Sequence, residues 1–278
     1  MNRILLSTVI LFLAFGASAH ADSSDAPAHH PTLFLVGDST VRNGSGKGAN
    51  GQWGWGDRIA PYFDSSKITV KNRAIGGRSS RSYQSEGRWD AVLKEAKPGD
   101  FVIIQMGHND GGPLAGDNRE RGSIRGIGEE TREVTLTLKP KTGQKEVVHT
   151  YGWYMRKYVS DARAKGLIPI ICSPIPHRPK TPVEEGTYEK SSYALWSAEV
   201  AKQEKVPFID LNHLVYAHYV GVEPAELKTK YFTAADDTHT NASGADLNAK
   251  CVVEGIAMLR DCPLKDYLLK QPVESDRK

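Results

Sequence analysis

The chain has 278 residues, of which 36 are basic and 33 acidic, and it carries a formal net charge of +3 and three cysteines. A charge so nearly balanced gives no reason to expect nucleic acid as a partner. No stretch after the N-terminal segment approaches the roughly 20 apolar residues of a membrane span, so we expect no membrane insertion. The length suits one well-buried α/β domain.

The first 21 residues are typical of a secretory signal peptide. A positive residue, Arg3, precedes a short apolar run at residues 4–15 and an Ala-x-Ala site that ends at Ala21. We expect cleavage after Ala21, or alternatively after Ala19, and a flexible mature N-terminus at residues 22–31. The mature protein is then secreted or periplasmic.

Apolar runs of strand length alternate with segments of helical length along the rest of the chain. We expect strands at 33–36, 68–70, 101–106, 167–172 and 206–210, and helices at 55–63, 87–96, 150–165, 191–204, 211–220 and 241–259. This alternation predicts an α/β fold with a parallel sheet covered on both faces, in a single domain spanning residues 32–278. Pro169 predicts a position where the sheet can spare a hydrogen-bond donor, and Asn241 is a predicted helix cap.

One insertion is expected in this domain, at residues 111–148. Residues 111–130 are rich in glycine and charge, which is typical of a surface excursion. Residues 133–138 alternate with period two and, with residues 146–149, predict a hairpin. The sequence leaves open whether this insertion shapes a binding cleft or only decorates the fold.

Ser39 lies where the first predicted strand ends, in Gly37-Asp38-Ser39-Thr40. Ligands bind at the carboxyl edge of an open α/β sheet, so a serine there is a candidate nucleophile if the chain also supplies a base and oxyanion donors. Gly-Asp-Ser alone equally suits an ordinary turn.

A candidate base lies 200 residues later, in Asp236-Asp237-Thr238-His239. Asp236 and His239 are three residues apart, so in a helical turn their side chains share a face and Asp236 accepts the Nδ1 proton. Nε2 of His239 then points towards a hydroxyl, as a serine nucleophile requires. Two alternatives are a solvated turn and metal binding by Asp236, Asp237 and His239, the latter weakened by the lack of a third cluster of ligands.

Three groups are candidate donors to an oxyanion. The backbone N–H of Gly77 has no side chain beside it, the N–H of Ser39 is a second donor, and the Asn109 side-chain amide is a third. The structural alternatives are a turn at Gly76-Gly77 and a helix cap at Asn109.

Taken together, the blocks Gly-Asp-Ser, Gly-Gly-Arg-Ser, Gly-His-Asn-Asp and Asp-x-x-His resemble the SGNH branch of the GDSL hydrolases. The resemblance implies Ser39 as nucleophile, Gly77 and Asn109 as oxyanion donors, and His239 as base with Asp236 as its partner. It also implies a flavodoxin-like three-layer α/β/α sandwich with a five-stranded parallel sheet, and no metal or organic cofactor. Gly-x-Ser-x-Gly is absent, which argues against an α/β-hydrolase.

A narrower resemblance, to the rhamnogalacturonan acetylesterases among the carbohydrate esterases, covers nearly the whole mature chain. It rests on six blocks, at 37–40, 72–83, 107–110, 149–152, 173–176 and 236–240. It implies a secreted serine esterase that removes O-acetyl groups from pectin or a related polysaccharide or oligosaccharide, by way of an acetyl-serine intermediate. The alternatives are an acetylxylan esterase, a GDSL lipase or thioesterase, a metal-dependent hydrolase and a glycan-binding module without catalysis.

Basic and aromatic residues near the predicted site suit an acidic glycan. The candidates for carboxylate binding are Arg78, Arg81, His177 and Arg178, because the planar fork of an arginine can pair both carboxylate oxygens. Trp53, Trp55 and Tyr83 are candidates for stacking on sugar rings, with core packing as the equal alternative.

The three cysteines, Cys172, Cys251 and Cys262, are expected to be free and mostly buried. Most of the segment between Cys251 and Cys262 looks helical, and a rise of about 1.5 Å per residue holds the two roughly 15 Å apart, too far for a disulfide. No Cys-x-x-Cys or paired Cys/His spacing indicates a zinc site.

Overall fold

A computed structural model of the chain describes residues 30–186 and 191–270. The predicted signal peptide at residues 1–21 and most of the predicted flexible N-terminus at 22–31 lie outside these residues. The boundary at 31 is wrong, because Pro31 is buried and its carbonyl accepts the backbone N–H of Thr69 (3.0 Å).

A five-stranded sheet, parallel throughout, forms the centre of the fold, with the strand order β2-β1-β3-β6-β7. Its strands are β1 (Thr32–Gly37), β2 (Thr69–Asn72), β3 (Phe101–Gln105), β6 (Ile168–Cys172) and β7 (Phe208–Ile209). Since β1 and β3 are buried on both faces, they are continuous apolar runs. The chain leaves β1 for β2 on one side and later returns to β3 on the other, and this reversal opens a crevice at their carboxyl ends.

The proline in β6 occupies the predicted kind of position. Pro169 faces Val102 of β3, whereas β7 pairs only with Ile171 and Cys172. The nitrogen of residue 169 therefore lies before β7 begins, where no ladder bond is lost.

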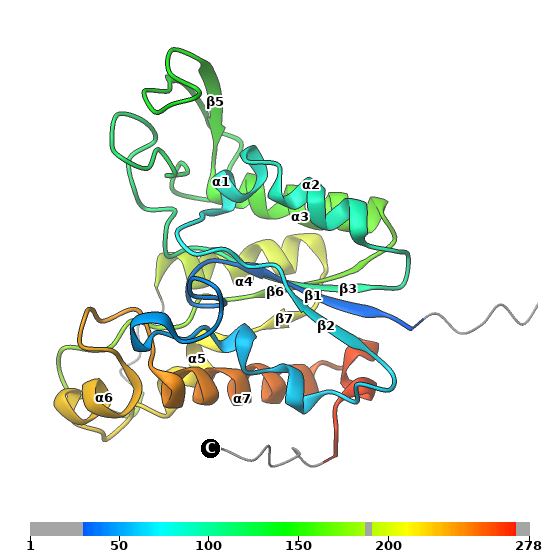
Figure 1. Cartoon of the computed structure of the whole chain (residues 1–278), viewed down its shortest axis with the longest axis vertical. Helices are drawn as coiled ribbons and strands as arrows, with labels where there is room; N and C mark the ends of the chain where they lie inside the picture. Colours follow the sequence, from blue (N-terminus) through cyan, green and yellow to red (C-terminus); the bar gives the residue numbers. More distant parts are fainter. Residues whose placement is uncertain (1–29, 187–190, 271–278) are drawn as a thin grey trace, which may run out of the picture.

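Helices cover both faces of the sheet, as Figure 1 shows. One face carries α1 (Ser80–Ser85), α2 (Arg88–Glu95), α3 (Tyr151–Ala164) and α4 (Ser192–Glu204), and the other carries α5 (Leu211–Ala217) and α7 (Ala242–Met258). Phe34 and Val36 point into the first core and Leu33 and Leu35 into the second, because successive strand side chains alternate. The three-layer α/β/α sandwich expected of an SGNH hydrolase is confirmed.

Two helices were not expected, and one expected helix is absent. Ser79 caps α1 through a reciprocal bond with Ser82, and α6 (Pro224–Tyr231) begins with a proline at its first residue. Instead of a helix at 55–63, two 3₁₀ turns run over Trp55–Asp57 and Ala60–Tyr62.

The insertion forms the predicted hairpin, from β4 (Thr131–Thr135) and β5 (Lys145–His149), beyond the edge of the sheet and above α1 (Figure 1). The three cysteines are buried and free, as expected. Within the described residues, none of the helices is long and apolar enough to cross a membrane.

Candidate active site

Ser39 lies in a tight turn directly after β1. Val41 and Arg42 both donate their backbone N–H to the carbonyl of Asp38, at 3.1 and 3.0 Å, so the chain reverses at the sheet edge. Gly37 permits this turn because a Cβ there would lie 2.4 Å from Val41 Cγ2. The Ser39 side chain is thereby left at the surface of the crevice.

His239 and Asp236 complete a chain of hydrogen bonds that begins at Ser39. Ser39 Oγ lies 2.8 Å from His239 Nε2, and His239 Nδ1 lies 2.7 Å from Asp236 Oδ2. Because the carboxylate can only accept, Nδ1 carries the hydrogen and Nε2 offers its lone pair to the hydroxyl. The three side chains can therefore pass a proton from Ser39 to His239.

The turn that holds His239 is not helical, contrary to expectation, but it brings the same side chains together. Asp236 Oδ1 accepts the backbone N–H groups of Thr238 (2.8 Å) and His239 (2.7 Å), which is the turn that aspartate side chains favour. Burial alone would raise the pKa of Asp236. The hydrogen bonds from His239 and Thr238 outweigh it and hold that pKa below its usual value, so the carboxylate stays charged.

Three neighbouring elements fix this loop. Lys228 of α6 donates to the carbonyl of Asp236 (2.6 Å), and the Arg178 side chain pairs with Asp237 (2.9 Å). Asn241 then caps α7 by accepting the N–H of Gly244 (3.0 Å). The role of Lys228 was not predicted because α6 was not expected. The Glu-Pro-Ala-Glu start of that helix is the signal that could have shown it.

The candidate oxyanion donors lie together beside Ser39. A Cβ on Gly76 would be only 3.5 Å from Ser39 Cβ, so the peptide between Gly76 and Gly77 borders the serine. Gly77 has φ +78°, which favours glycine, and Asn109 Nδ2 donates to the carbonyl of Arg78 (2.9 Å). Among the described residues, the backbone N–H groups of Ser39 and Gly77 donate to no protein acceptor. Both remain available to a ligand oxygen.

A buried ion pair lies behind Ser39, and sequence analysis did not foresee it. His108 Nδ1 lies 3.2 Å from Asp38 Oδ2 and its Nε2 lies 3.1 Å from the carbonyl of Ile175. Since both partners can only accept, both ring nitrogens carry hydrogen and the imidazole is a cation. Burial alone would lower the pKa of His108, but the facing carboxylate outweighs it and raises that pKa, while the charge of His108 lowers the pKa of Asp38.

The other oxygen of Asp38 ends a buried chain of hydrogen bonds from Trp55. Trp55 Nε1 donates to Gln105 (2.8 Å), Gln105 donates to Thr40 Oγ1 (2.7 Å), and Thr40 donates to Asp38 Oδ1 (2.8 Å). These bonds hold both residues that flank Ser39. Trp55 is thus fully buried and is not available to stack on a sugar.

A further buried carboxyl group, Asp110, lies beside the candidate oxyanion residue Asn109. Asp110 Oδ1 accepts the hydroxyls of Ser80 (2.5 Å) and Ser123 (2.9 Å), which tie the insertion to α1. Burial raises the pKa of Asp110 to about 6, although these hydrogen bonds act in the opposite direction.

Three of the predicted substrate-binding residues have bonding partners within the protein. Arg81 is only 1% exposed; it pairs with Glu146 (2.8 Å) and donates to two backbone carbonyls of the insertion. Tyr83 is equally buried and donates its hydroxyl to the carbonyl of Arg73 (2.6 Å). Arg178 is held by Asp237, as described above. For Arg81 and Tyr83 the substrate-binding prediction is wrong, because both residues are only 1% exposed. For Arg178, whose side chain is partly exposed, it stays a prediction.

The remaining predicted contacts lie nearer the surface. Arg78 pairs with Glu86 (3.0 Å) and lies next to Gly77. His177 is exposed and its Nδ1 lies 2.8 Å from Thr238 Oγ1, one residue from His239. Trp53 is half-buried, donates its backbone N–H to Thr240 (2.9 Å), and has the Arg58 guanidinium 5.1 Å from its ring centroid. A substrate role for Arg78, His177 and Trp53 stays a prediction.

A metal site was the other hypothesis for Asp236, Asp237 and His239. In the part of the chain that the structure describes, no three His, Cys, Asp or Glu side chains are grouped so as to hold a metal ion. The side chain of Asp237 instead pairs with Arg178 and Lys228.

Residues 35–247 match the family described as GDSL-like lipase/acylhydrolase. The chain is 34% identical over 227 residues to a rhamnogalacturonan acetylesterase of Emericella nidulans, which covers 81% of this chain and 84% of that relative. It is 31% identical over 244 residues to a probable rhamnogalacturonan acetylesterase of Bacillus subtilis, which covers 86% of this chain and 98% of that relative.

Solved structures with the same fold include two bacterial proteins. A Bacillus subtilis protein superposes with a TM-score of 0.63 at 27% identity, over 83% of this chain but only 57% of the other. An acetylxylan esterase of Geobacillus stearothermophilus gives a TM-score of 0.54 at 19% identity, over 84% of this chain and 97% of the other. The second likeness is one of fold alone.

Proposed function

Because this chain belongs to the GDSL-like lipase/acylhydrolase family and is a carboxylic ester hydrolase, we propose that it is a serine esterase that removes O-acetyl groups from rhamnogalacturonan. The observation that carries the serine mechanism is the hydrogen-bonded chain from Ser39 through His239 to Asp236, at 2.8 and 2.7 Å. The two acetylesterase relatives, which match over most of their length, support the substrate class.

In this mechanism Ser39 Oγ attacks the acetyl carbonyl while His239 Nε2 takes the hydroxyl proton. The charge that develops on the carbonyl oxygen is met by the N–H groups of Ser39 and Gly77 and by the amide of Asn109, each worth a few kcal/mol of barrier. The tetrahedral intermediate then collapses, the bond between the acetyl carbon and the sugar oxygen breaks, and His239 gives its proton to that oxygen. Asp236 keeps the ring in the required tautomer and stabilises the imidazolium that forms.

The acetyl-serine intermediate is hydrolysed by the same groups. A water molecule takes the place of the departed sugar, His239 removes its proton, and the hydroxide adds to the acetyl carbonyl. The tetrahedral intermediate collapses to acetate, and the proton returns from His239 to Ser39. No bond in this sequence calls for a group beyond those of the chain and water.

Acetate release from acetylated rhamnogalacturonan tests the proposal, with acetylated xylan in parallel and Ser39→Ala as the control. We expect fast release from the pectic substrate that Ser39→Ala reduces by several orders of magnitude without changing the melting temperature. Release from xylan alone would keep the serine mechanism and overturn the substrate. Undiminished release by Ser39→Ala would overturn the mechanism.

We also propose that the protein acts outside the cytoplasm, where plant polysaccharides are found. The support is the charge and apolar pattern of residues 1–21. N-terminal sequencing of the protein recovered from the medium or periplasm tests this, and the expected new N-terminus is Asp22. An intact Met1 in a protein retained in the cytoplasm would contradict it.

A further inference from the structure

A basic pocket adjoins Ser39, and the proposed mechanism does not use it. It has a volume of about 440 Å³, within the usual range for ligand sites. Gly76 and Gly77 form the wall towards Ser39. The charged residues of the lining are Arg78, Arg119, Arg121 and Glu86. Two of the three arginines come from the insertion.

Arg121 joins the insertion to the candidate oxyanion site. Its Nη1 donates to the carbonyl of Gly77 (2.9 Å), and a Cβ on Gly77 would lie 3.4 Å from the same nitrogen. The pocket is therefore within one residue of the peptide that borders Ser39. A sugar bound in it lies next to the sugar whose acetyl group is attacked.

Two of the three arginines in this pocket form no ion pair within the described residues. Glu86 is shared between Arg78 (3.0 Å) and Arg88 (2.6 Å), whereas among the described residues no carboxylate forms an ion pair with Arg119 or Arg121. Partial burial and the nearby charge of Arg119 lower the pKa of the Arg121 guanidinium. The carboxylates of Asp117, Asp38 and Asp110 act in the opposite direction from beyond ion-pair distance and do not reverse the shift. An anion bound between the two guanidinium groups therefore relieves the remaining repulsion.

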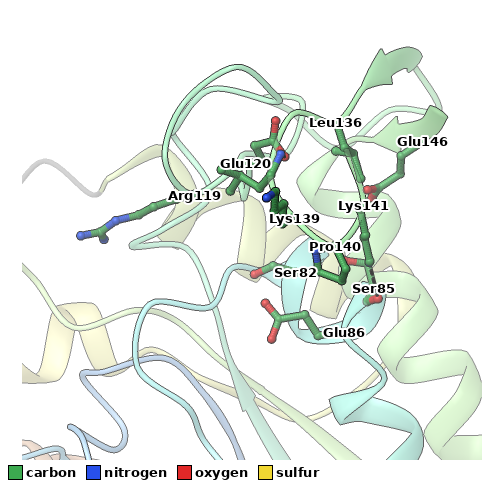
Figure 2. A pocket seen from close by; sticks show the side chains of 11 residues that line it. Ser82, Ser85, Glu86, Arg119, Glu120, Leu136, Lys139, Pro140, Lys141 and Glu146 are labelled. Carbon is green, nitrogen blue, oxygen red and sulfur yellow. Dashed lines mark hydrogen bonds between the residues drawn. The ribbon is translucent and has the colours of Figure 1, made fainter. Parts of the chain in front are cut away.

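The Arg119 side chain is available to a ligand. It is exposed. A second hollow of about 250 Å³ adjoins the pocket between α1 and the insertion, and Glu120 and Lys139 help to line it. Figure 2 shows the Arg119 side chain extending away from these two residues. The two hollows share four lining residues, so together they follow the insertion away from Ser39. These residues are Ser82, Glu86, Arg119 and Leu138. This arrangement suits a chain of sugars more than a single small ester.

We propose that this pocket binds the carboxylate of a uronic acid that neighbours the acetylated sugar, with Arg119 and Arg121 as the residues that select for it. The planar guanidinium groups offer several N–H donors, which suits the two oxygens of a carboxylate. The proposal rests on the proposed esterase function and assigns the insertion a part in substrate selection. A neutral acetylated glycan leaves both arginines without a carboxylate in direct contact.

The test compares two forms of one acetylated oligosaccharide, with its uronic acids either free or methyl-esterified. The measured quantity is the ratio of kcat/KM for the free acid to kcat/KM for the methyl ester. We expect the wild-type ratio to exceed one and to fall as salt is added, because salt screens exposed charges. In the variant Arg119→Gln/Arg121→Gln this ratio should be about tenfold lower than in the wild type. A tenfold change corresponds to the free energy of one hydrogen bond to a charged group.

The matched control is Arg132→Gln, which removes one positive charge from an exposed position of β4 in the same insertion, outside the pocket. It should leave the ratio unchanged. Because Arg121 also contacts Gly77, the double variant lowers turnover of both substrates. Arg119→Gln alone leaves that contact in place, so it separates the loss of preference for the free acid from the loss of turnover. Arg119→Gln should lower the ratio by about two- to fivefold, as an exposed ion pair does. A ratio of one in the wild type, or an equal ratio in all variants, would overturn the proposal.

Failure of the esterase function gives a different result. Binding of the deacetylated acidic oligosaccharide to the wild-type protein, measured by calorimetry, does not depend on turnover. Hydrolysis without a preference for the free acid would contradict carboxylate binding in the pocket and would support the esterase function. The opposite result is binding of the acid that Arg119→Gln weakens, with no hydrolysis of any acetyl ester. It would support carboxylate binding in the pocket and contradict the esterase function.

Discussion

Two histidine–carboxylate pairs border Ser39, one open and one buried. The His239 and Asp236 side chains are 25% and 38% exposed, on a loop before α7. The His108 and Asp38 side chains are 6% and 0% exposed, between β1 and β3. In both pairs Nδ1 faces a carboxylate oxygen, so the residue types alone do not distinguish them.

The partner of the second ring nitrogen makes the difference. Nε2 of His239 faces the Ser39 hydroxyl, which can donate, so this nitrogen keeps a lone pair and can act as a base. Nε2 of His108 faces the carbonyl of Ile175, which can only accept, so His108 is held as a cation with no proton to gain. A histidine–aspartate contact therefore indicates a base only when the other nitrogen meets a donor.

Replacing the open histidine gives the largest expected effect. His239→Gln removes the base and should lower kcat on an acetyl ester by about 10⁴-fold or more. The melting temperature should stay close to that of the wild type, because the side chain is partly exposed. Steady-state kinetics and thermal unfolding measure the two quantities, and His218→Gln, an exposed position on the far end of α5, is the control. Activity within tenfold of the wild type would remove His239 from the mechanism.

Replacing the buried histidine should act on stability instead. His108→Leu leaves the Asp38 carboxylate buried without its cation, which should cost about 3–5 kcal/mol in the free energy of unfolding. Urea denaturation measures this cost, and His239→Leu provides the comparison, with a much smaller expected loss.

The double variant Asp38→Asn/His108→Leu sharpens the comparison between the pairs. It removes both charges and should be more stable than His108→Leu alone. If His108→Leu costs no more than His239→Leu, the two pairs do not differ in the way described.

A buried carboxyl group without a facing imidazole gives a third, smaller effect. Burial raises the pKa of Asp110 to about 6, so the folded state holds its proton more tightly than the unfolded chain. Its contribution to stability is complete below about pH 4 and is lost as the pH rises through about 6. The wild-type advantage over Asp110→Asn should therefore shrink by on the order of 2 kcal/mol between these pH values.

Urea denaturation of both proteins at a series of pH values measures this difference. An advantage that is constant with pH, or one that grows as the pH rises, would show that Asp110 does not titrate as described. The control is the Ser191→Ala protein, whose substitution introduces no titrating group.

The smallest expected effect concerns the anchor of the open pair. Asn241 caps α7 two residues after His239, and Asn241→Ala should cost about 1 kcal/mol of stability together with part of the turnover, because the loop that holds His239 loosens. Ser191→Ala removes the similar cap of α4 at a comparable cost in stability. Turnover that falls equally in both variants would argue against a role of the α7 cap in placing His239.

The order of the strands and the place of the site could be predicted because the motif blocks begin where strands end. Ser39 and Asn109 follow the apolar strands β1 and β3, and Gly77 follows the half-buried strand β2. The carboxyl ends of parallel strands share one edge. His239 could be added because it lies three residues after Asp236, although the turn between them proved to be an aspartate turn rather than a helical one.

Side-chain direction in short elements could not be predicted. Arg81 and Tyr83 lie on α1, a six-residue helix that was not expected, so no helical face could be assigned to either residue. At 55–63, Pro61 and the close approach of Gly54 and Gly56 to Val41 replace a helix by 3₁₀ turns. These contacts are tertiary and leave no periodic signal.

The basic pocket was missed for a related reason. Arg119 and Arg121 belong to an irregular, glycine-rich part of the insertion, where no period indicates which side chains point inward. Tertiary contacts show that this segment reaches the edge of the sheet, namely the bond from Arg121 to Gly77 and the bonds from Ser123 to Asp110.

The contact between Ser39 and His239 joins residues 200 positions apart in the chain. In the proposed mechanism the nucleophile lies in the turn after the first strand, whereas its base is held in place only once α6 and α7 have docked against the sheet. A chain still being synthesised or exported thus has its reactive hydroxyl long before it has the means to activate it. Contacts of such long range form at a high cost in loop-closure entropy. Esterase activity should consequently report the completed fold. A truncated or partly folded chain should not hydrolyse esters.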